Sequence, residues 1–183
     1  MRSDEQLVEV ASDGDDAAFV ELVERYQERL LRFLLARCRS HADAEDALQD
    51  TFMNAYRYLD SFDPRWRFST WIYRIGIRNL MRTTAPDSAE SGELADPGAD
   101  PLRDCIRASE RENLWVTART VLSADAYTAL WLRYAEDMSI REISTAMDRS
   151  VSWAKVTLLR ARNRLSAEMQ DGSRDPNEGE VYG

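Results

Sequence analysis

The most unusual chemistry in this chain lies between residues 65 and 82, which read RWRFSTWIYRIGIRNLMR. The stretch holds five arginines, two tryptophans, a phenylalanine and a tyrosine, and it holds no acid. Bases of single-stranded nucleic acid stack on aromatic rings, while arginines hold the phosphate backbone. On a helix, Trp71, Arg74 and Arg78 would be neighbours on one face. A second interpretation stays open, in which the rings form a core and the arginines only solubilise the surface.

A second cationic stretch lies near the C-terminus. Its basic residues are Arg149, Lys155, Arg160, Arg162 and Arg164, with no acid between them. A short capped helix, a tight polar turn and a longer basic helix are typical of a helix-turn-helix, whose second helix enters the major groove of DNA. Arginines further along that helix can bind phosphates. The alternative is a solvated basic face on a bundle helix.

Acidic side chains gather on a third stretch, DAEDALQDTFMNAY, at residues 43–56. On one interpretation, its acids form a docking face for a basic partner protein. On the other, the helix is solvated and self-capping, because Asp43 and Asp46 favour a helix N-terminus through capping and through the helix dipole.

The sequence shows no catalytic group of residues, and we expect no enzymatic activity, no cofactor and no metal. The chain has one histidine, His41, and two cysteines, Cys38 and Cys105. Cys38 and His41 could face one metal ion, but two ligands do not make a zinc site. Two cysteines are too few for a disulfide framework, so we expect buried or unreactive thiols. Gly76 stands alone within a helix, so no glycine-rich phosphate loop is predicted.

These stretches need helices to position them. Apolar residues recur every three or four positions and no segment alternates like a strand, which predicts an all-α fold. Ser3 with Gln6, and Ser139 with Glu142, have the spacing of capping boxes. We expect four helices before the linker, starting near residues 3, 15, 43 and 69. After it we expect a helix over about 106–122, one capped by Ser123, a short one over 140–147, and a long one over about 151–168.

Composition divides the chain into two small helical domains. Residues 84–104 contain three prolines, two glycines and many acids, which predicts a flexible linker between domains at residues 3–83 and 105–168. The acidic residues 169–183 are expected to form a disordered tail. The formal net charge is -9, so the free protein should bind DNA weakly through long-range repulsion. Without a long apolar run or a signal-peptide pattern, we expect a cytoplasmic protein with no direct membrane insertion.

In this order, the three stretches resemble the extracytoplasmic-function (ECF) group of bacterial sigma-70 family sigma factors. DAEDALQDTFMNAYRYLDSF is similar to the family's region 2.2, FSTWIYRI to region 2.3, and REISTAMDRSVSWAKVTLLRARNRL to region 4.2. The resemblance covers nearly all of residues 5–168, including an acidic linker at the family's position. It implies a protein that binds the β and β′ subunits of core RNA polymerase and directs promoter-specific transcription initiation, and that is not itself an enzyme.

The resemblance also implies a role for each surface. The helix that docks on the clamp helices of the β′ subunit would use Asp46, Gln49, Asp50 and Phe52. The segment that melts and holds the −10 promoter element as a single strand would use Phe68, Thr70, Trp71, Arg74, Arg78 and Asn79. The helix that reads the −35 element would use Ser150, Ser152, Trp153, Lys155 and Arg160. The linker would thread near the polymerase active site and RNA exit path.

The sequence departs from the family pattern at four positions. Arg78 lies where the family usually has asparagine, and the asparagine is displaced by one residue to Asn79, which rotates it by about 100° on a helix. Arg82 replaces an aspartate of the family. Asp148 takes the place of the usual turn glycine, and Arg149 that of a common apolar residue. We therefore expect the preferred −10 and −35 sequences to differ from those of relatives.

Two other classes of protein stay open on the sequence. One is an ordinary helix-turn-helix regulator that binds duplex operator DNA as a dimer, although it leaves residues 65–82 unexplained. The other is an α-helical scaffold without nucleic acid. For the sigma-factor interpretation, the resemblance further implies an anti-sigma factor that covers both modules and holds the protein inactive.

Overall fold

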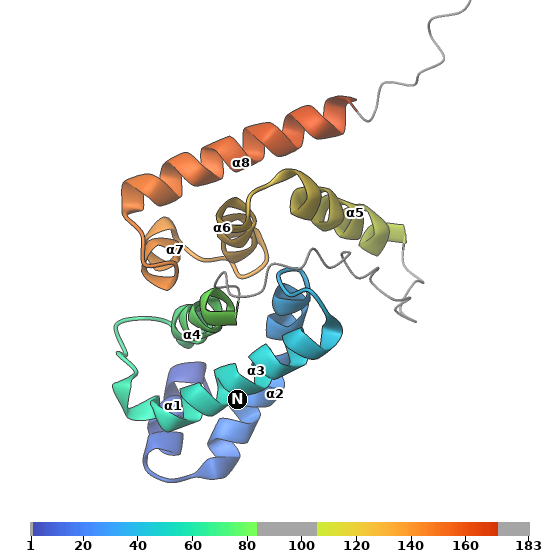
Figure 1. Ribbon diagram of the computed structural model, residues 1–183. Helices are drawn as coiled ribbons and strands as arrows, with labels where there is room; N and C mark the ends of the chain where they lie inside the picture. The colour runs from blue at the N-terminus through green and yellow to red at the C-terminus, as the bar shows by residue number, and fades with distance from the viewer. Residues whose placement is uncertain (1, 84–105, 172–183) are drawn as a thin grey trace, which may run out of the picture.

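The computed structural model describes residues 2–83 and 106–171, with side chains placed for residues 2–81 and 114–169. The described part is all helical and contains no strand, which confirms the predicted all-α fold. Its elements are α1 (Asp4–Ser12), α2 (Asp16–Leu35), α3 (His41–Arg57), the 3-10 turn η1 (Leu59–Ser61), α4 (Phe68–Thr83), α5 (Ile106–Val121), α6 (Ala124–Tyr134), α7 (Ile140–Ala146) and α8 (Val151–Asp171) (Figure 1). The predicted linker and most of the predicted tail lie outside the described residues.

Side-chain caps start the helices of the N-terminal module. Ser3 and Gln6 form the predicted capping box at α1, and the Asp15 carboxylate accepts a hydrogen bond from the Ala17 amide at α2. The third helix begins earlier than the sequence suggested, at His41 rather than near Asp43. The reason is that Ser40 adopts an extended backbone and caps α3 by accepting a hydrogen bond from the Asp43 amide.

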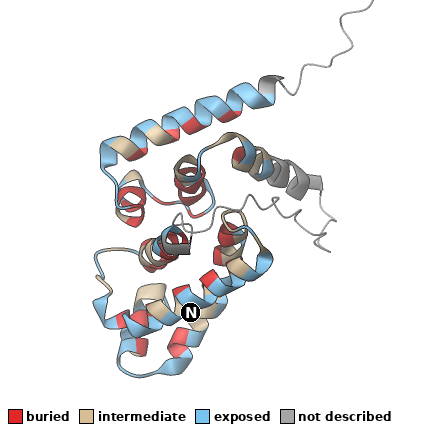
Figure 2. Ribbon diagram, viewed as in Figure 1, coloured by how far each residue is buried: buried red, intermediate tan, exposed pale blue. Residues whose placement is uncertain are grey.

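The core of the N-terminal module lies between α4 and the three helices before it (Figure 2). Leu22, Leu30 and Phe33 on α2 and Ile72 and Tyr73 on α4 are fully buried. Each large apolar side chain removed from water in this way contributes about 1.5–3 kcal/mol relative to leaving it exposed. The burial fixes which face of α4 is turned inward, and so which face is turned away from the bundle.

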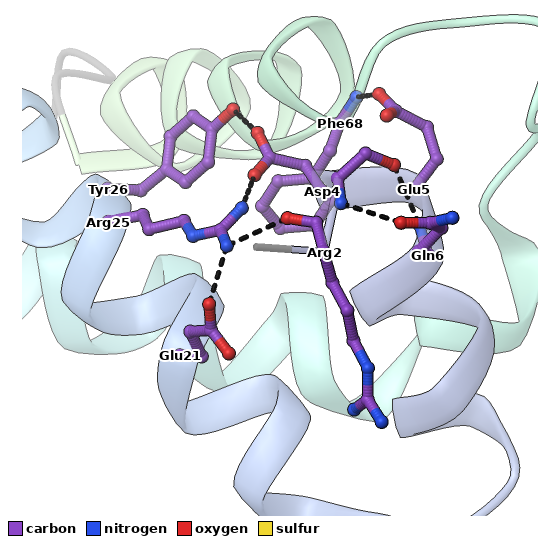
Figure 3. Close-up of polar contacts among 9 residues, drawn as sticks. Arg2, Asp4, Glu5, Gln6, Glu21, Arg25, Tyr26 and Phe68 are labelled. Carbon is purple, nitrogen blue, oxygen red and sulfur yellow. Dashed lines mark hydrogen bonds and ion pairs between the residues drawn. The ribbon is translucent and has the colours of Figure 1, made fainter.

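Polar contacts at one end of the bundle hold α1 against α2 and the start of α4 (Figure 3). The Asp4 carboxylate accepts hydrogen bonds from the Arg25 guanidinium and from the Tyr26 hydroxyl. Burial raises the pKa of Tyr26, and the bond to Asp4 raises it further. The Glu5 carboxylate accepts from the backbone amide of Phe68 at 3.4 Å, which gives the first turn of α4 a partner from α1. The network therefore anchors the start of the arginine-aromatic helix.

The C-terminal module contains the predicted helix-turn-helix. Ser139 and Glu142 form the expected capping box at α7, and α8 follows after a turn. Asp148 in this turn has φ 54°, in the left-handed region that glycine, asparagine and aspartate tolerate best. The Ser150 hydroxyl accepts from the Trp153 amide at 3.1 Å and caps α8.

An aromatic cluster of Trp115, Tyr127 and Trp131 joins α5 to α6, with ring centroids 4.9 Å apart for the two tryptophans.

The two modules lie against each other in the structure. Helix α4 contacts α7, and α6 and α7 lie beside the N-terminal bundle (Figure 1). The Phe33 and Trp131 rings, one from each module, have centroids 6.1 Å apart. Buried residues lie on α4, α6 and α7 where the two modules meet (Figure 2). Nothing in the local sequence pattern indicated this contact.

The glycine inside α4 provides a test of the packing. A Cβ added at Gly76 would lie 3.5 Å from Leu30 Cδ1 and 3.6 Å from Thr51 Oγ1, which is ordinary contact. Because alanine has less conformational freedom to lose on folding, Gly76→Ala should raise the free energy of unfolding by about 0.5–1 kcal/mol. Thermal unfolding followed by circular dichroism measures the effect.

Gly14→Ala is the matched control, because Gly14 has φ 99° with nothing within 4 Å of the added Cβ. It should lower the free energy of unfolding by about 1 kcal/mol through backbone strain alone. A lower melting temperature for Gly76→Ala would show that α4 packs more tightly on α2 and α3 than described.

Candidate nucleic-acid interface

One face of α4 is turned away from the N-terminal core and carries the predicted single-strand chemistry. Trp71 and Arg74 are half-buried and Arg78 is exposed. The Trp71 ring packs edge-on against Phe62, with centroids 5.7 Å apart, and is tilted against Phe68 at 5.8 Å. These contacts hold the indole in place and leave part of it accessible. The face therefore offers one oriented ring and two guanidinium groups at helical spacing, as stacking and phosphate contact require.

Two residues predicted for the same surface lie inside the bundle. Phe68 is completely buried and packs on Tyr26 with ring centroids 5.1 Å apart. Asn79 is 8% exposed; its amide nitrogen donates to Thr51 Oγ1 at 3.2 Å, and its amide oxygen accepts from Asn54 at 3.3 Å. In this arrangement Phe68 supports the Trp71 ring from beneath, and Asn79 joins α4 to α3. The rotation of one helical step therefore separates exposed Arg78 from interior Asn79.

The remaining predicted residue of this group, Thr70, faces the C-terminal module. It is 1% exposed, and its hydroxyl donates to the Glu142 carboxylate at 3.4 Å. Arg67 Nε lies 4.0 Å from the same carboxylate. Arg74 Nη2 lies 3.8 Å from the Asp148 carboxylate in the helix-turn-helix turn. Glu142 and Asp148 were not predicted as partners of α4, because each has a local explanation, Glu142 in a capping box and Asp148 in a turn.

The predicted −35 residues lie at the start of α8 and along it. Ser150, Ser152, Lys155 and Arg160 are exposed, and Trp153 is half-buried. The Arg149 guanidinium lies 5.6 Å from the Trp153 ring centroid and also contacts the Asp125 carboxylate at 3.3 Å. Ala154, Leu158, Ala161 and Leu165 form the buried face of the helix. Polar and basic groups thus remain available on the opposite face for base edges and phosphates.

The predicted docking helix keeps its acids in solvent. Asp46, Gln49 and Asp50 are exposed on α3, and Phe52 is half-buried. Their spacing of three and four residues places the first three on one face, while Ala44, Ala47, Thr51 and Ala55 face the core. Capping of α3 is performed by Ser40, so Asp46 and Asp50 are not needed for it.

The C-terminal module also contains an apolar groove that the sequence analysis did not identify. Its volume is about 660 Å³, and it lies between α5, α6 and α8. Only the pattern of apolar residues on α5 and α8 could have hinted at it, and that pattern fits a closed core equally well. The groove is lined mainly by Leu114, Trp115, Leu130, Tyr134, Leu165 and Met169.

The described residues contain neither a group of metal ligands nor a helix that could span a membrane. Within residues 2–83 and 106–171, no three His, Cys, Asp or Glu side chains gather as metal ligands would. None of the helices in these ranges is long and apolar enough to cross a membrane. Cys38 is half-buried, and burial raises the pKa of its thiol, which makes the reactive thiolate scarcer. Cys105 lies outside the described residues.

Comparison with known proteins identifies the family of this chain. The family model for Sigma-70 region 2 matches residues 22–85, and that for Sigma-70 region 4 matches residues 120–165. The RNA polymerase sigma-H factor of Pseudomonas aeruginosa is 33% identical over 181 residues, covering 91% of this chain and 94% of that protein. The ECF RNA polymerase sigma-E factor of Haemophilus influenzae is 32% identical over 183 residues, covering 92% and 96%.

Solved structures share the fold. CnrH in complex with the cytosolic domain of CnrY has a TM-score of 0.69 and 25% identity, covering 94% of this chain and all of that one. The sigma factor RpoE bound to the anti-sigma factor NepR from Bartonella quintana has a TM-score of 0.59 and 24% identity, covering 85% and 98%. The two family models and these relatives together define a sigma factor of RNA polymerase. The chain belongs to the ECF group of the sigma-70 family, and the resemblance seen in the sequence is confirmed.

The contrast between Arg78 and Asn79 gives a stability prediction. Asn79→Ala leaves buried groups on Thr51 and Asn54 without a hydrogen-bond partner from α4, so it should lower the free energy of unfolding by about 1–3 kcal/mol. Arg78→Ala is the control at the adjacent residue. It should change the free energy of unfolding by less than about 0.5 kcal/mol, because Arg78 is exposed. Urea unfolding of both variants measures the difference. Equal effects would place Asn79 at the surface.

Proposed function

We propose that this sigma factor binds core RNA polymerase through the exposed face of α3, opens and holds the −10 promoter element on α4, and reads the −35 element with α8. The observation that carries the proposal is that acidic, arginine-aromatic and basic side chains lie on the outer faces of three different helices, in the order of the family's regions. The opposite face of each helix is packed in a core. The protein contributes binding and positioning, and the polymerase performs the catalysis. Its place of action is the cytoplasm, where transcription occurs.

Promoter opening is assigned to the outer face of α4, with Thr70, Trp71, Arg74 and Arg78 as contacts, Phe68 as support for Trp71, and Asn79 as a positioning residue. The −35 contacts are Ser150, Ser152, Trp153, Lys155 and Arg160, since the start of the second helix of a helix-turn-helix enters the major groove. A regulatory partner is also proposed, because two similar structures are complexes, one of CnrH with the cytosolic domain of CnrY and one of the sigma factor RpoE with the anti-sigma factor NepR.

Run-off transcription with purified core polymerase tests the proposal. Core polymerase with this protein should start at a subset of promoters from the source genome, and core alone should not. Mapping start sites after overexpression would supply those promoters through their shared upstream elements. Failure to bind core together with failure to start at any promoter would refute the proposal. Binding to palindromic duplex DNA as a dimer, without affinity for core, would instead indicate an ordinary regulator.

Charge on α3 should govern the affinity for core. We expect Asp50→Ala to weaken binding by about fivefold or more, the loss of over 1 kcal/mol that marks an important interface residue. Asp60→Ala is the control, because Asp60 is also an exposed acid of the N-terminal module but lies on η1. Fluorescence titration of labelled protein with core measures both affinities. Equal affinities for the two variants would remove Asp50 from the docking face.

Stacking on Trp71 should matter for opening and not for docking. Replacing Trp71 with alanine removes a base-stacking contact of roughly 1–3 kcal/mol, so open-complex formation should fall by about 5- to 150-fold. Permanganate footprinting of the −10 region measures opening, and titration with core measures docking. Tyr58→Ala, at an aromatic residue that is 56% exposed on the same module, serves as the control. A parallel loss of core affinity would contradict the assignment of Trp71 to the single strand.

A further inference from the structure

The two modules meet along a surface that we call the module seam. From the N-terminal module it contains Arg29 and Phe33 of α2, Arg67 just before α4, and Thr70 and Arg74 of α4. Opposite them lie Trp131, Glu136, Glu142 and Asp148 of the C-terminal module. The residues in contact are distant in sequence, so no local helix requirement brings them together. The seam covers part of the outer face of α4 that the proposed function assigns to promoter DNA.

Charge is distributed across the seam with one sign on each side. The guanidinium of Arg29 lies 3.4 Å from the Glu136 carboxylate, and those of Arg67 and Arg74 lie 4.0 and 3.8 Å from Glu142 and Asp148. In each of these ion pairs the arginine belongs to the N-terminal module and the acid to the C-terminal module. Thr70 is a further polar contact, since its hydroxyl donates to the Glu142 carboxylate.

Carboxylates at these positions compete with DNA for the same groups. A single strand is held by arginines that contact its phosphates, and phosphates and carboxylates both offer anionic oxygen acceptors to a guanidinium. While Glu142 and Asp148 lie on Arg67, Thr70 and Arg74, these groups cannot also contact a phosphate from the same side. The acids of the helix-turn-helix therefore occupy the place of the strand backbone.

The seam is built so that it can open. The Tyr73 hydroxyl and the Trp131 indole N–H are buried near Glu136, yet neither makes a hydrogen bond of good geometry with another described residue, and the buried Glu136 Oε2 has only its ion pair with Arg29. Each buried polar group without such a bond costs about 1–3 kcal/mol. The ion pairs at the edge are partly solvated, with Arg67 56% and Asp148 80% exposed, and such pairs contribute little. These polar contacts therefore add only modestly to the apolar contact of Phe33 with Trp131 that joins the two modules.

We propose that the C-terminal module acts as an intramolecular DNA mimic, in which Glu142 and Asp148 close over Arg67, Thr70 and Arg74 and keep the single-strand surface of α4 covered until polymerase separates the modules. The proposal rests on the proposed function only in assigning α4 to single-stranded DNA. On this proposal, the free protein binds DNA weakly because Glu142 and Asp148 compete at short range with DNA phosphates, and not because of long-range repulsion.

The experiment compares two variants of the full chain with the same change of charge. The seam variant is Glu142→Gln with Asp148→Asn; glutamine preserves the capping box at α7, and asparagine tolerates the left-handed turn. The control variant is Glu24→Gln with Asp137→Asn. Glu24 and Asp137 are exposed and take part in none of the ion pairs of the seam, and Asp137, with φ 50°, has the same backbone conformation as Asp148.

Two measurements apply to wild type and to both variants. Fluorescence anisotropy at low salt gives the affinity for a labelled single-stranded DNA of random sequence, and small-angle X-ray scattering gives the radius of gyration. The seam variant should bind the strand at least about tenfold more tightly than wild type, since covering a site reduces apparent affinity by the fraction of molecules in which it is open. Its radius of gyration should increase. The control variant should match wild type in shape and gain far less affinity.

Three results would overturn the proposal. Equal gains in affinity for both variants would mean that net charge alone controls binding. No gain and no expansion for the seam variant would mean that the acids do not cover α4. A concentration-dependent dimer of the wild type that the seam variant abolishes would place the seam between two copies. Run-off transcription by wild-type protein with core is measured separately, so failure of the sigma-factor function itself would be recognised independently of these results.

Discussion

Burial of one face of α4 is the constraint on which the rest of the structure depends. Ile72 and Tyr73 fill the core of the N-terminal bundle, and Phe68 anchors the helix where Glu5 meets its first amide. Because successive residues on a helix are about 100° apart, fixing this face leaves Trp71, Arg74 and Arg78 on the other. The same packing that stabilises the bundle therefore orients the surface proposed to hold melted DNA, and no separate scaffold is needed.

This constraint also explains why neighbouring residues have such different environments. Arg78 is exposed and Asn79 is buried with hydrogen bonds to Thr51 and Asn54. An asparagine shifted by one residue from the family position therefore exchanges a surface location for an interior one. The arginine that replaces it brings a positive charge to the outer face.

Local features of the sequence predicted local features of the structure well. The capping boxes at Ser3 and Ser139, the all-helical fold and the exposed basic face of α8 follow from spacing that the chain itself displays. The start of α3 was missed because Ser40 has no Glu or Gln three residues later to signal a capping box. The contact between Thr70 and Glu142 could not be predicted, because it joins residues 72 positions apart and each has a sufficient local explanation. The apolar groove was hidden for a related reason, since residues that line a groove and residues that fill a core share one pattern.

Asp148 shows how one residue can satisfy a local and a distant requirement together. The turn before α8 needs a left-handed conformation, for which glycine is the least strained choice and aspartate is tolerated. Glycine would satisfy the turn and leave Arg74 without this acid. Aspartate is slightly more strained in this conformation, but its carboxylate lies 3.8 Å from Arg74 of α4. The departure from the family's glycine is therefore informative, because Asp148 lies where the helix-turn-helix meets the surface proposed for the single strand. The acidity of this chain then acts at short range and at particular positions. Charges in solvent are screened within about 8–10 Å at physiological salt, whereas partly buried charges in contact are screened much less.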